Sequence, residues 1–265
     1  MEQIFSHNNM EFLMDSLIAW VGGKKQLRAV IAEMIPENIN GYIEPFGGAG
    51  WVLFFKDRWA KLEVYNDIDA RLTNLFLVAK YHKEELHKEL QLMLDSRFLF
   101  DKIITQPGLT DIQRAARFFI IIKRSFGAKG EHFGTSKKDK STKSLKRMID
   151  QVMMVADRLD QVKIETKDYK EIFEIYDSKE NFFFLDPPYR HGVQYKSGRM
   201  NYEIFLKELK KLKGRFLLTI DDCSENLKLF KEFNIKKIDR CNGINRKNIV
   251  NNRFKELIIT NYEQI

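Results

Sequence analysis

The amino-acid sequence predicts an α/β fold: a doubly wound, mostly parallel seven-stranded sheet with an antiparallel hairpin at one edge and a helical insertion. Seven short apolar runs have the length and composition of strands. Helical patterns lie between most of these runs, and alternation of strand and helix favours parallel pairing. The last two runs are joined by the polar segment 240–253, which has no helical pattern and therefore predicts a hairpin.

Each predicted strand is a short run rich in aliphatic and aromatic residues. In chain order, the strands are Gly41–Phe46, Leu62–Asn66, Val162–Thr166, Asn181–Leu185, Arg215–Asp221, Ile235–Asp239 and Glu256–Tyr262. Examples of the helical patterns between them are Lys24–Met34, Ala70–Tyr81, Ser144–Leu159 and Tyr202–Leu212.

The interval between the second and third strands is much longer than the others. It contains helical patterns and a basic segment but no convincing strand. We therefore predict one domain built from residues 1–71 and 160–265, interrupted by a helical insertion at 72–159.

Composition is that of a globular protein, with 44% hydrophobic and 31% charged residues. No apolar run approaches the roughly 18 residues of a membrane span, and the N-terminus lacks the pattern of a secretory signal. The two cysteines, Cys223 and Cys241, form no disulfide framework, and no paired Cys/His spacing suggests zinc. We expect an intracellular protein without a metal.

Positive charge is concentrated in two segments. Residues 123–147 contain nine Lys/Arg against two acidic residues, and residues 236–255 contain seven against one. Such clusters suit a polyanion, because each neutralised phosphate releases condensed counterions. Two solvated basic loops would explain the same composition, so nucleic acid is favoured only modestly at this point.

A glycine-rich turn follows the first strand. In "YIEPFGGAG", Gly47 and Gly48 would let the backbone approach a ligand closely. Asp67 lies in "VYNDID", twenty residues after Gly47, close to the spacing at which an acid meets a ribose in dinucleotide-binding folds. Because no phosphate-binding Lys-Ser/Thr follows, the expected ligand is a nucleoside without a pyrophosphate.

Two weaker candidates come from other segments. "AWVGGKKQL" places a tryptophan, a glycine pair and Lys24 before the first long helix, although an ordinary loop would also fit. Asp168 follows the third strand, where it could accept a hydrogen bond from an adenine amino group. A helix N-cap is an equally good interpretation of Asp168.

The stretch "NFFFLDPPYR" joins a buried strand to an acid, two prolines and a tyrosine. Alone, it could be a proline-rich turn with a solvated Asp186. However, the carboxyl ends of parallel strands meet at one edge of the sheet, where ligands bind in doubly wound folds. We therefore expect Asp186, the glycine turn, Asp67 and Asp168 to share one crevice.

Four motifs in this order, "WVGGK", "EPFGGAG", "YNDID" and "DPPY", resemble the DNA adenine methylase family. The resemblance runs from Trp20 to the closing "ELIITNYE" and implies a site-specific, adenine-specific DNA methyltransferase that uses S-adenosylmethionine, with a Rossmann-like catalytic domain. It implies that residues 72–159 serve DNA target recognition. The segment 114–134 looks more like the phage-borne branch than the readers of GATC.

The resemblance also implies roles for individual residues. The catalytic motif corresponds to Asp186, Pro187, Pro188 and Tyr189. The cofactor-binding positions correspond to Trp20, Lys24, Phe46, Gly47, Gly48, Asp67, Asp168 and Asp186. The basic residues expected to contact DNA are Lys123, Arg124, Lys129, Lys137, Lys138, Lys140, Arg246 and Lys247.

The chemistry of the amine explains why an acid and a rigid turn belong together. An adenine amine is a poor nucleophile, because its lone pair is delocalised into the ring. Asp186 and the Pro187 carbonyl would accept its N–H groups and favour a tetrahedral nitrogen, while the prolines fix the backbone. Tyr189 would stack on the base, which must leave the duplex to be reached.

One departure leaves a residue without a role: Asp221 stands in "LLTIDD" where relatives often have an amide. Alternatives are a methyltransferase of this fold acting on RNA or protein glutamine, and a catalytically silent DNA-binding relative. The expected partner is double-stranded DNA, with no membrane and no metal, and a restriction endonuclease partner is left open. The expected location is the cytoplasm of a bacterial cell, as a bacterial or phage-encoded protein.

Overall fold

The computed structural model describes residues 14–93, 96–134, 145–192, 198, 200–241 and 253–263. It contains a seven-stranded sheet in the order β3-β2-β1-β4-β5-β7-β6. The strands are β1 (Gly41–Glu44), β2 (Leu62–Asn66), β3 (Val162–Glu165), β4 (Asn181–Leu185), β5 (Arg215–Asp221), β6 (Asn234–Cys241) and β7 (Arg253–Thr260). All seven predicted strands are therefore present, with ends shifted by a few residues.

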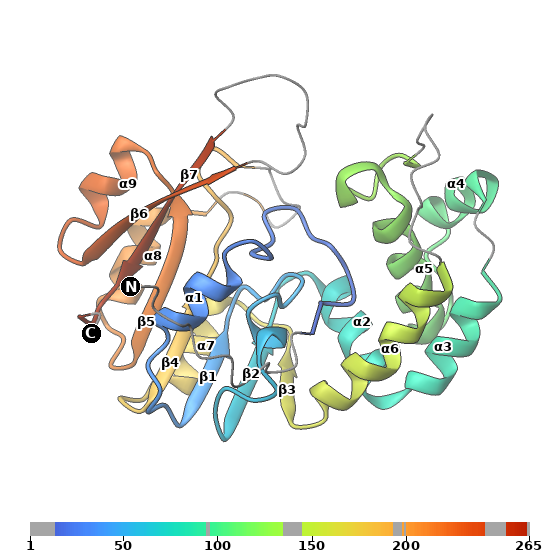
Figure 1. The fold of residues 1–265 in the computed structure, drawn as a ribbon, viewed down its shortest axis with the longest axis horizontal. Coiled ribbons are helices and arrows are strands. Elements are labelled where there is room, and N and C mark those ends of the chain that lie inside the picture. Colours follow the sequence, from blue (N-terminus) through green and yellow to red (C-terminus); the bar gives the residue numbers. More distant parts are fainter. Residues whose placement is uncertain are drawn as a thin grey trace, which may run out of the picture. The chain divides into compact units, whose positions relative to one another are not determined.

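The strand pairing confirms the predicted fold class. Strands β1 to β5 pair in parallel, for example with Ile43 opposite both Val64 and Phe183. Strand β7 pairs antiparallel with both β5 and β6, so the last two strands form the hairpin at one edge. The fold is thus α/β and doubly wound, with one antiparallel hairpin (Figure 1).

The chain divides into two compact units. The sheet unit comprises Met34–Gly48, Ala60–Leu75 and Val162–Ile265, and the helical unit comprises Met1–Glu33, Ala49–Trp59 and Phe76–Gln161. The predicted insertion at 72–159 thus lies largely in the helical unit, together with two earlier segments. Its role in target recognition stays a prediction.

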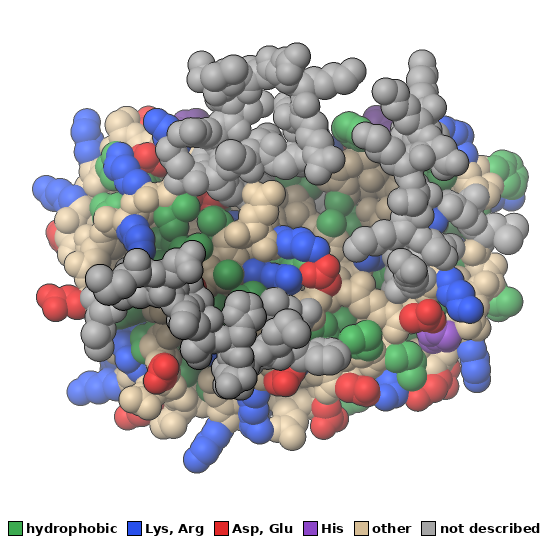
Figure 2. Space-filling view, viewed as in Figure 1, with side chains coloured by type: hydrophobic (Ala, Val, Ile, Leu, Met, Phe, Trp, Pro, Cys, Tyr) green, Lys and Arg blue, Asp and Glu red, His purple; other side chains and the backbone are tan. Residues whose placement is uncertain are grey.

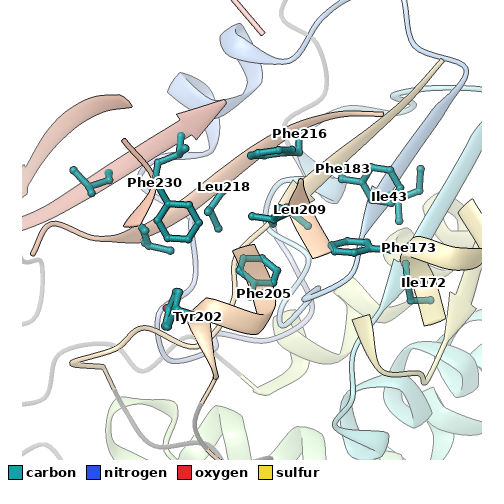
Figure 3. Packing of buried hydrophobic residues seen from close by; sticks show 14 of the residues in the cluster. Ile43, Ile172, Phe173, Phe183, Tyr202, Phe205, Leu209, Phe216, Leu218 and Phe230 are labelled. Carbon is teal, nitrogen blue, oxygen red and sulfur yellow. The ribbon is translucent and has the colours of Figure 1, made fainter. Parts of the chain in front are cut away.

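The sheet unit has an aromatic core on one face of the sheet. Helices α7 (Tyr169–Tyr176), α8 (Tyr202–Leu209) and α9 (Ser224–Leu229) belong to this unit. Buried side chains of α7 and α8 pack with alternate residues of the strands, since successive residues of a strand point to opposite faces. Figure 3 shows this cluster, with Ile172, Phe173, Phe205 and Leu209 from the helices and Ile43, Phe183, Phe216 and Leu218 from the strands.

The opposite face of the sheet is also buried, but buried polar side chains such as Glu44, Glu63 and Thr219 lie among its apolar ones. Tyr42 and Phe182, on neighbouring strands, stack with ring centroids 6.1 Å apart, and both are inaccessible to solvent. A parallel sheet buried on both faces has nearly continuous apolar strands, and this is the pattern of "NFFFL".

The helical unit is built from amphipathic helices. Its elements, including those that continue into the sheet unit, are α1 (Arg28–Met34), η1 (Leu53–Phe55), α2 (Ala70–Tyr81), α3 (Lys83–Gln91), α4 (Arg97–Thr105), α5 (Asp111–Arg124), η2 (Phe126–Ala128) and α6 (Leu145–Leu159). Helix α5 packs against α3 and α4, and α3 packs against α6. Ser96 and Thr110 cap α4 and α5 by accepting hydrogen bonds from backbone N–H groups of the first turn. None of the described helices is both long and apolar enough to span a bilayer.

Candidate active site

The site lies at the carboxyl edge of the sheet, where the chain reverses its direction of winding. From β1 the chain continues to β2 and β3 on one side, and it returns to β4 and β5 on the other. The glycine turn after β1 and the "DPPY" turn after β4 therefore follow neighbouring parallel strands. Such a switch point is where doubly wound sheets bind ligands.

The turn after β1 is fitted closely to the next strand. The Gly47 N–H donates to the Asn66 carbonyl over 2.7 Å. A Cβ atom at Gly47 would lie 2.3 Å from the ring of Tyr65, so a larger residue would displace the turn. The Tyr65 hydroxyl donates to the Gly48 carbonyl over 2.6 Å, and burial raises the pKa of Tyr65, which keeps this donor protonated.

Asp67 lies beside this turn. Its carboxylate accepts hydrogen bonds from the backbone N–H groups of Gly48 and Asp69, each over 2.8 Å. Burial raises the pKa of Asp67 to about 6, against the opposing effect of these two hydrogen bonds and of the nearby Arg71. The arrangement brings together an acid and a glycine turn, as the sequence predicted for a ribose-binding position.

Asn66 is a residue to which the sequence motifs assign no role. It is inaccessible to solvent, and its amide donates to the carbonyls of Pro45 (2.8 Å) and Lys167 (3.0 Å). Its Oδ1 accepts from the Lys167 N–H over 2.8 Å. One buried amide thus ties together the segments after β1 and β3. In the sequence, the only indication of this role is that Asn66 is a polar residue at the end of an apolar strand.

Asp168 is the N-cap of α7. It is exposed, and its side chain accepts a hydrogen bond from the Lys170 N–H over 2.9 Å. The capping interpretation therefore describes the observed contact, while an adenine contact stays a prediction. The half-buried Phe46 packs against Tyr169 and Phe205, with ring centroids 5.5 and 5.9 Å away, and supplies an apolar wall close by.

The "DPPY" turn begins directly where β4 ends. Thr219 of β5 donates from Oγ1 to Asp186 Oδ1 over 2.8 Å, which orients the carboxylate. Thr219 is inaccessible to solvent and was not predicted as a site residue, since a threonine inside an apolar strand is typical of ordinary sheet packing. The Pro188 carbonyl accepts a hydrogen bond from the Tyr202 hydroxyl over 2.7 Å. The Pro187 carbonyl accepts no hydrogen bond within the described part of the chain.

Trp20 and Lys24 belong to the helical unit. The Trp20 ring lies 6.0 Å from that of Phe118, and Lys24 is buried and donates to the Gly22 carbonyl over 2.8 Å. The helix predicted to begin at Lys24 begins at Arg28, after a turn in which the Lys24 carbonyl accepts from the Leu27 and Arg28 N–H groups.

The basic residues predicted to bind DNA have different environments. Lys129 is exposed, Lys123 lies over the Phe119 ring at 5.3 Å, and the side chain of Arg124 is buried. Burial weakens the case for Arg124 as a phosphate ligand. Figure 2 shows Lys and Arg side chains interspersed with acidic ones on the visible face. Outside the described residues lie Lys137, Lys138, Lys140, Arg246 and Lys247.

The chemistry of the donor set suits S-adenosylmethionine. The Asp67 carboxylate could accept hydrogen bonds from a ribose, the glycine turn leaves no side chain at Gly47, and Phe46 could supply an aromatic surface. Among the described residues, one group could instead hold a metal ion: His191, Asp221 and Cys223, with candidate ligand atoms within 4.8 Å of one another.

Several solved structures and sequences are similar to this chain. A precorrin 8w decarboxylase from Methanobacterium thermoautotrophicum aligns over 95% of this chain and 100% of its own, with 12% identity and a TM-score of 0.43. An S-adenosylmethionine-dependent O-methyltransferase from Thermotoga maritima aligns over 91% and 66%, with 10% identity and a TM-score of 0.38.

The sequence relatives are more informative. The Type II methyltransferase M1.LlaDCHI of Lactococcus lactis subsp. cremoris is 28% identical, over 92% of this chain and 94% of its own. The Type II methyltransferase M.MjaIII of Methanocaldococcus jannaschii is 27% identical, over 92% and 98%.

A family model decides among the functions that the sequence left open. The model of the D12 class N6 adenine-specific DNA methyltransferases matches residues 20–244, which include the glycine turn, Asp67 and the "DPPY" turn. This match favours DNA adenine over RNA, protein glutamine or a silent DNA-binding role. The chain therefore belongs to the D12 class N6 adenine-specific DNA methyltransferases, and it is an enzyme that methylates adenine in DNA with S-adenosylmethionine as methyl donor.

Proposed function

We propose that the enzyme methylates the 6-amino group of an adenine extruded from double-stranded DNA at a specific sequence, and that Asp186 to Tyr189 carry out the chemistry. The observation that supports this is the position of the "DPPY" turn beside the glycine turn, after neighbouring parallel strands. Bound S-adenosylmethionine would supply an activated methyl group on its sulfonium.

The protein's own groups would prepare the amine. The Asp186 carboxylate, oriented by Thr219, and the Pro187 carbonyl would accept the two N–H groups of the adenine. With both protons held, the nitrogen lone pair is freed from the ring and can face the methyl group in line. Because this is a matter of geometry, no covalent enzyme intermediate is needed. As the nitrogen–carbon bond forms and the carbon–sulfur bond breaks, the nitrogen becomes cationic, and it then loses one of its two protons to solvent. Asp67 and the glycine turn would hold the cofactor, and Tyr189 would stack on the extruded base.

The test compares variants of the two predicted catalytic side chains. Asp186→Ala removes an acceptor that matters most as the nitrogen becomes tetrahedral, so turnover should fall at least about a hundredfold, by analogy with the loss of one oxyanion-hole donor. Tyr189→Ala should lose about 1–3 kcal/mol of stacking, and Tyr189→Phe should recover most of it, since the ring face makes the contact.

Single-turnover methylation of an adenine-containing duplex is the measurement, with circular dichroism as the control for folding. A folded Asp186→Ala protein that transfers methyl groups at the normal rate would contradict the mechanism. Equal rates for the Ala and Phe variants at Tyr189 would contradict stacking. Sequencing of the methylated duplex identifies the recognition sequence.

We propose that a restriction endonuclease recognises the same DNA sequence as this enzyme, because both similar sequences above are Type II methyltransferases. We propose that methylation protects DNA from that endonuclease, in the cytoplasm where the DNA lies. Digestion of methylated and unmethylated DNA by endonucleases of known specificity, once the site is mapped, tests this.

A further inference from the structure

The residues that follow the "DPPY" turn are hydrogen-bonded to Asp221, the acid that stands where relatives often have an amide. Asp221 is the last residue of β5, the parallel neighbour of β4. Its Oδ1 accepts from the Arg190 N–H over 3.2 Å, and its Oδ2 accepts from the His191 N–H over 3.4 Å. The His191 ring Nδ1 lies 2.8 Å from the same Oδ2. The Asp221 side chain is only 17% exposed.

A buried amide fixes the orientation of this carboxylate. Asn226, inaccessible to solvent, donates from Nδ2 to both the main-chain carbonyl and Oδ1 of Asp221, each over 3.0 Å. The Asn226 Oδ1 accepts from Arg190 Nε over 3.2 Å. The Arg190 guanidinium in turn lies 4.7 Å from the centre of the Tyr202 ring.

The other side of the turn is held by Tyr202, which is labelled in Figure 3. Its hydroxyl donates to the Pro188 carbonyl. Burial raises the pKa of Tyr202 well above its usual range, so the hydroxyl remains a donor. Tyr189 therefore lies between two main-chain anchors: the Pro188 carbonyl before it and the Arg190 and His191 N–H groups after it.

We propose that Asp221 is a positioning residue, which fixes the main chain around Tyr189 so that the ring is ready to stack on the extruded adenine. The proposal rests on the proposed role of Tyr189. It also explains why an acid replaces the amide expected here. An ionised carboxylate only accepts hydrogen bonds, at about four lone-pair positions, so both of its oxygens can accept main-chain N–H groups. An amide has a single acceptor oxygen, and its NH₂ group would face one of these N–H groups, donor against donor.

The same geometry argues against a metal ion at His191, Asp221 and Cys223. Both carboxylate oxygens of Asp221 already accept main-chain N–H groups, with which a metal would compete.

The decisive experiment places Asp221→Asn, an isosteric change, in two backgrounds. In the wild-type background, single-turnover methylation should slow about ten- to a hundredfold, the effect expected for losing hydrogen bonds to a charged group. Cofactor affinity by calorimetry should be unchanged. In the Tyr189→Ala background, the same change should have almost no further effect, because there is no ring left to position.

The matched control is Asp222→Asn. Asp222 is the next residue, its side chain is 11% exposed, and it pairs with Lys237 at 3.3 Å rather than with the turn. This variant should methylate at the wild-type rate. If Asp221→Asn does not fold, Tyr202→Phe removes the other anchor and should show the same dependence on Tyr189.

Two outcomes would overturn the proposal. Equal slowing by Asp221→Asn in both backgrounds would mean that Asp221 acts without Tyr189. Loss of wild-type activity on chelation, restored by Zn²⁺, would mean that the three side chains hold a metal. A failure of the proposed role of Tyr189 is recognised separately, because Tyr189→Ala alone would then methylate at the normal rate. A failure of the proposed function itself would show as no methylation of the duplex by the wild-type protein.

Discussion

Two opposing effects act on the carboxyl group of Asp67. Burial favours the neutral acid, whereas the N–H groups of Gly48 and Asp69 favour the ionised form. Burial is the larger effect, and the pKa of Asp67 is raised to about 6. A ribose hydroxyl would add a further donor to the ionised form, so binding of the cofactor should lower this pKa again.

The raised pKa of Asp67 predicts a pH dependence of definite sign. In the free enzyme, Asp67 is mostly neutral below about pH 6 and mostly ionised above it. Affinity for S-adenosylmethionine should therefore rise with pH through about 6 and then level off, because a carboxylate accepts stronger hydrogen bonds than a neutral acid, each worth roughly 1.5–3 kcal/mol. Calorimetry near pH 6 in buffers of different ionisation enthalpy should detect protons released on binding.

The control for Asp67 is the isosteric Asp67→Asn protein. It should bind the cofactor more weakly, with neither the pH dependence nor the proton release. An identical pH profile in the two proteins would remove Asp67 from the cofactor site.

At the scale of elements, the start of α7 shows how one residue can have two interpretations. Asp168 caps this helix through the Lys170 N–H. Asp168→Ala should lower the free energy of unfolding by about 1 kcal/mol, and Asp168→Asn should restore it, because asparagine is an equally good N-cap. Urea denaturation of the three proteins measures this effect.

Cofactor affinity in the same proteins separates the cap from the predicted adenine contact. Weaker binding in Asp168→Ala alone would trace to a loosened helix end. Weaker binding in Asp168→Asn as well would show that the carboxylate contacts the ligand directly. Equal stability of all three proteins would contradict the cap.

At the scale of the whole molecule, we expect the basic segment 123–147 to contribute to DNA binding through its positive charge. Replacing Lys137, Lys138 and Lys140 together with alanine should weaken DNA binding and flatten its salt dependence. For every phosphate that the variant no longer neutralises, the slope of log affinity against log salt concentration should decrease by about 0.9. Cofactor affinity should not change. Titration of a labelled duplex at several salt concentrations is the measurement.

A matched triple variant controls for net charge. Lys61, Lys179 and Lys213 are exposed and precede β2, β4 and β5, so they lie at the edge of the sheet opposite to the candidate site. Replacing these three with alanine removes the same charge but should leave the salt slope almost unchanged. If both triples alter the slope equally, the basic segment acts only through net charge.

The sequence by itself determined the fold class and the edge of the sheet at which three motifs of the candidate site lie. Short apolar runs predict the strands, and the helical patterns between them predict parallel pairing. The polar connection between the last two runs predicts the antiparallel hairpin, and the observed sheet has this arrangement. The motifs after β1, β2 and β4 could be placed at one edge because parallel strands have their carboxyl ends together. The family match over residues 20–244 agrees with those motifs.

Only the tertiary structure decided which residues support the motifs. Asn66, Thr219 and Asp221 are far in sequence from the groups that they hold, for example 33 residues between Thr219 and Asp186. The partners of Asn66 become neighbours only when β2 assembles between β1 and β3, and those of Thr219 and Asp221 only when β5 assembles beside β4. Hydrogen bonds depend on such distances rather than on local propensity, so spacing along the chain could not reveal them.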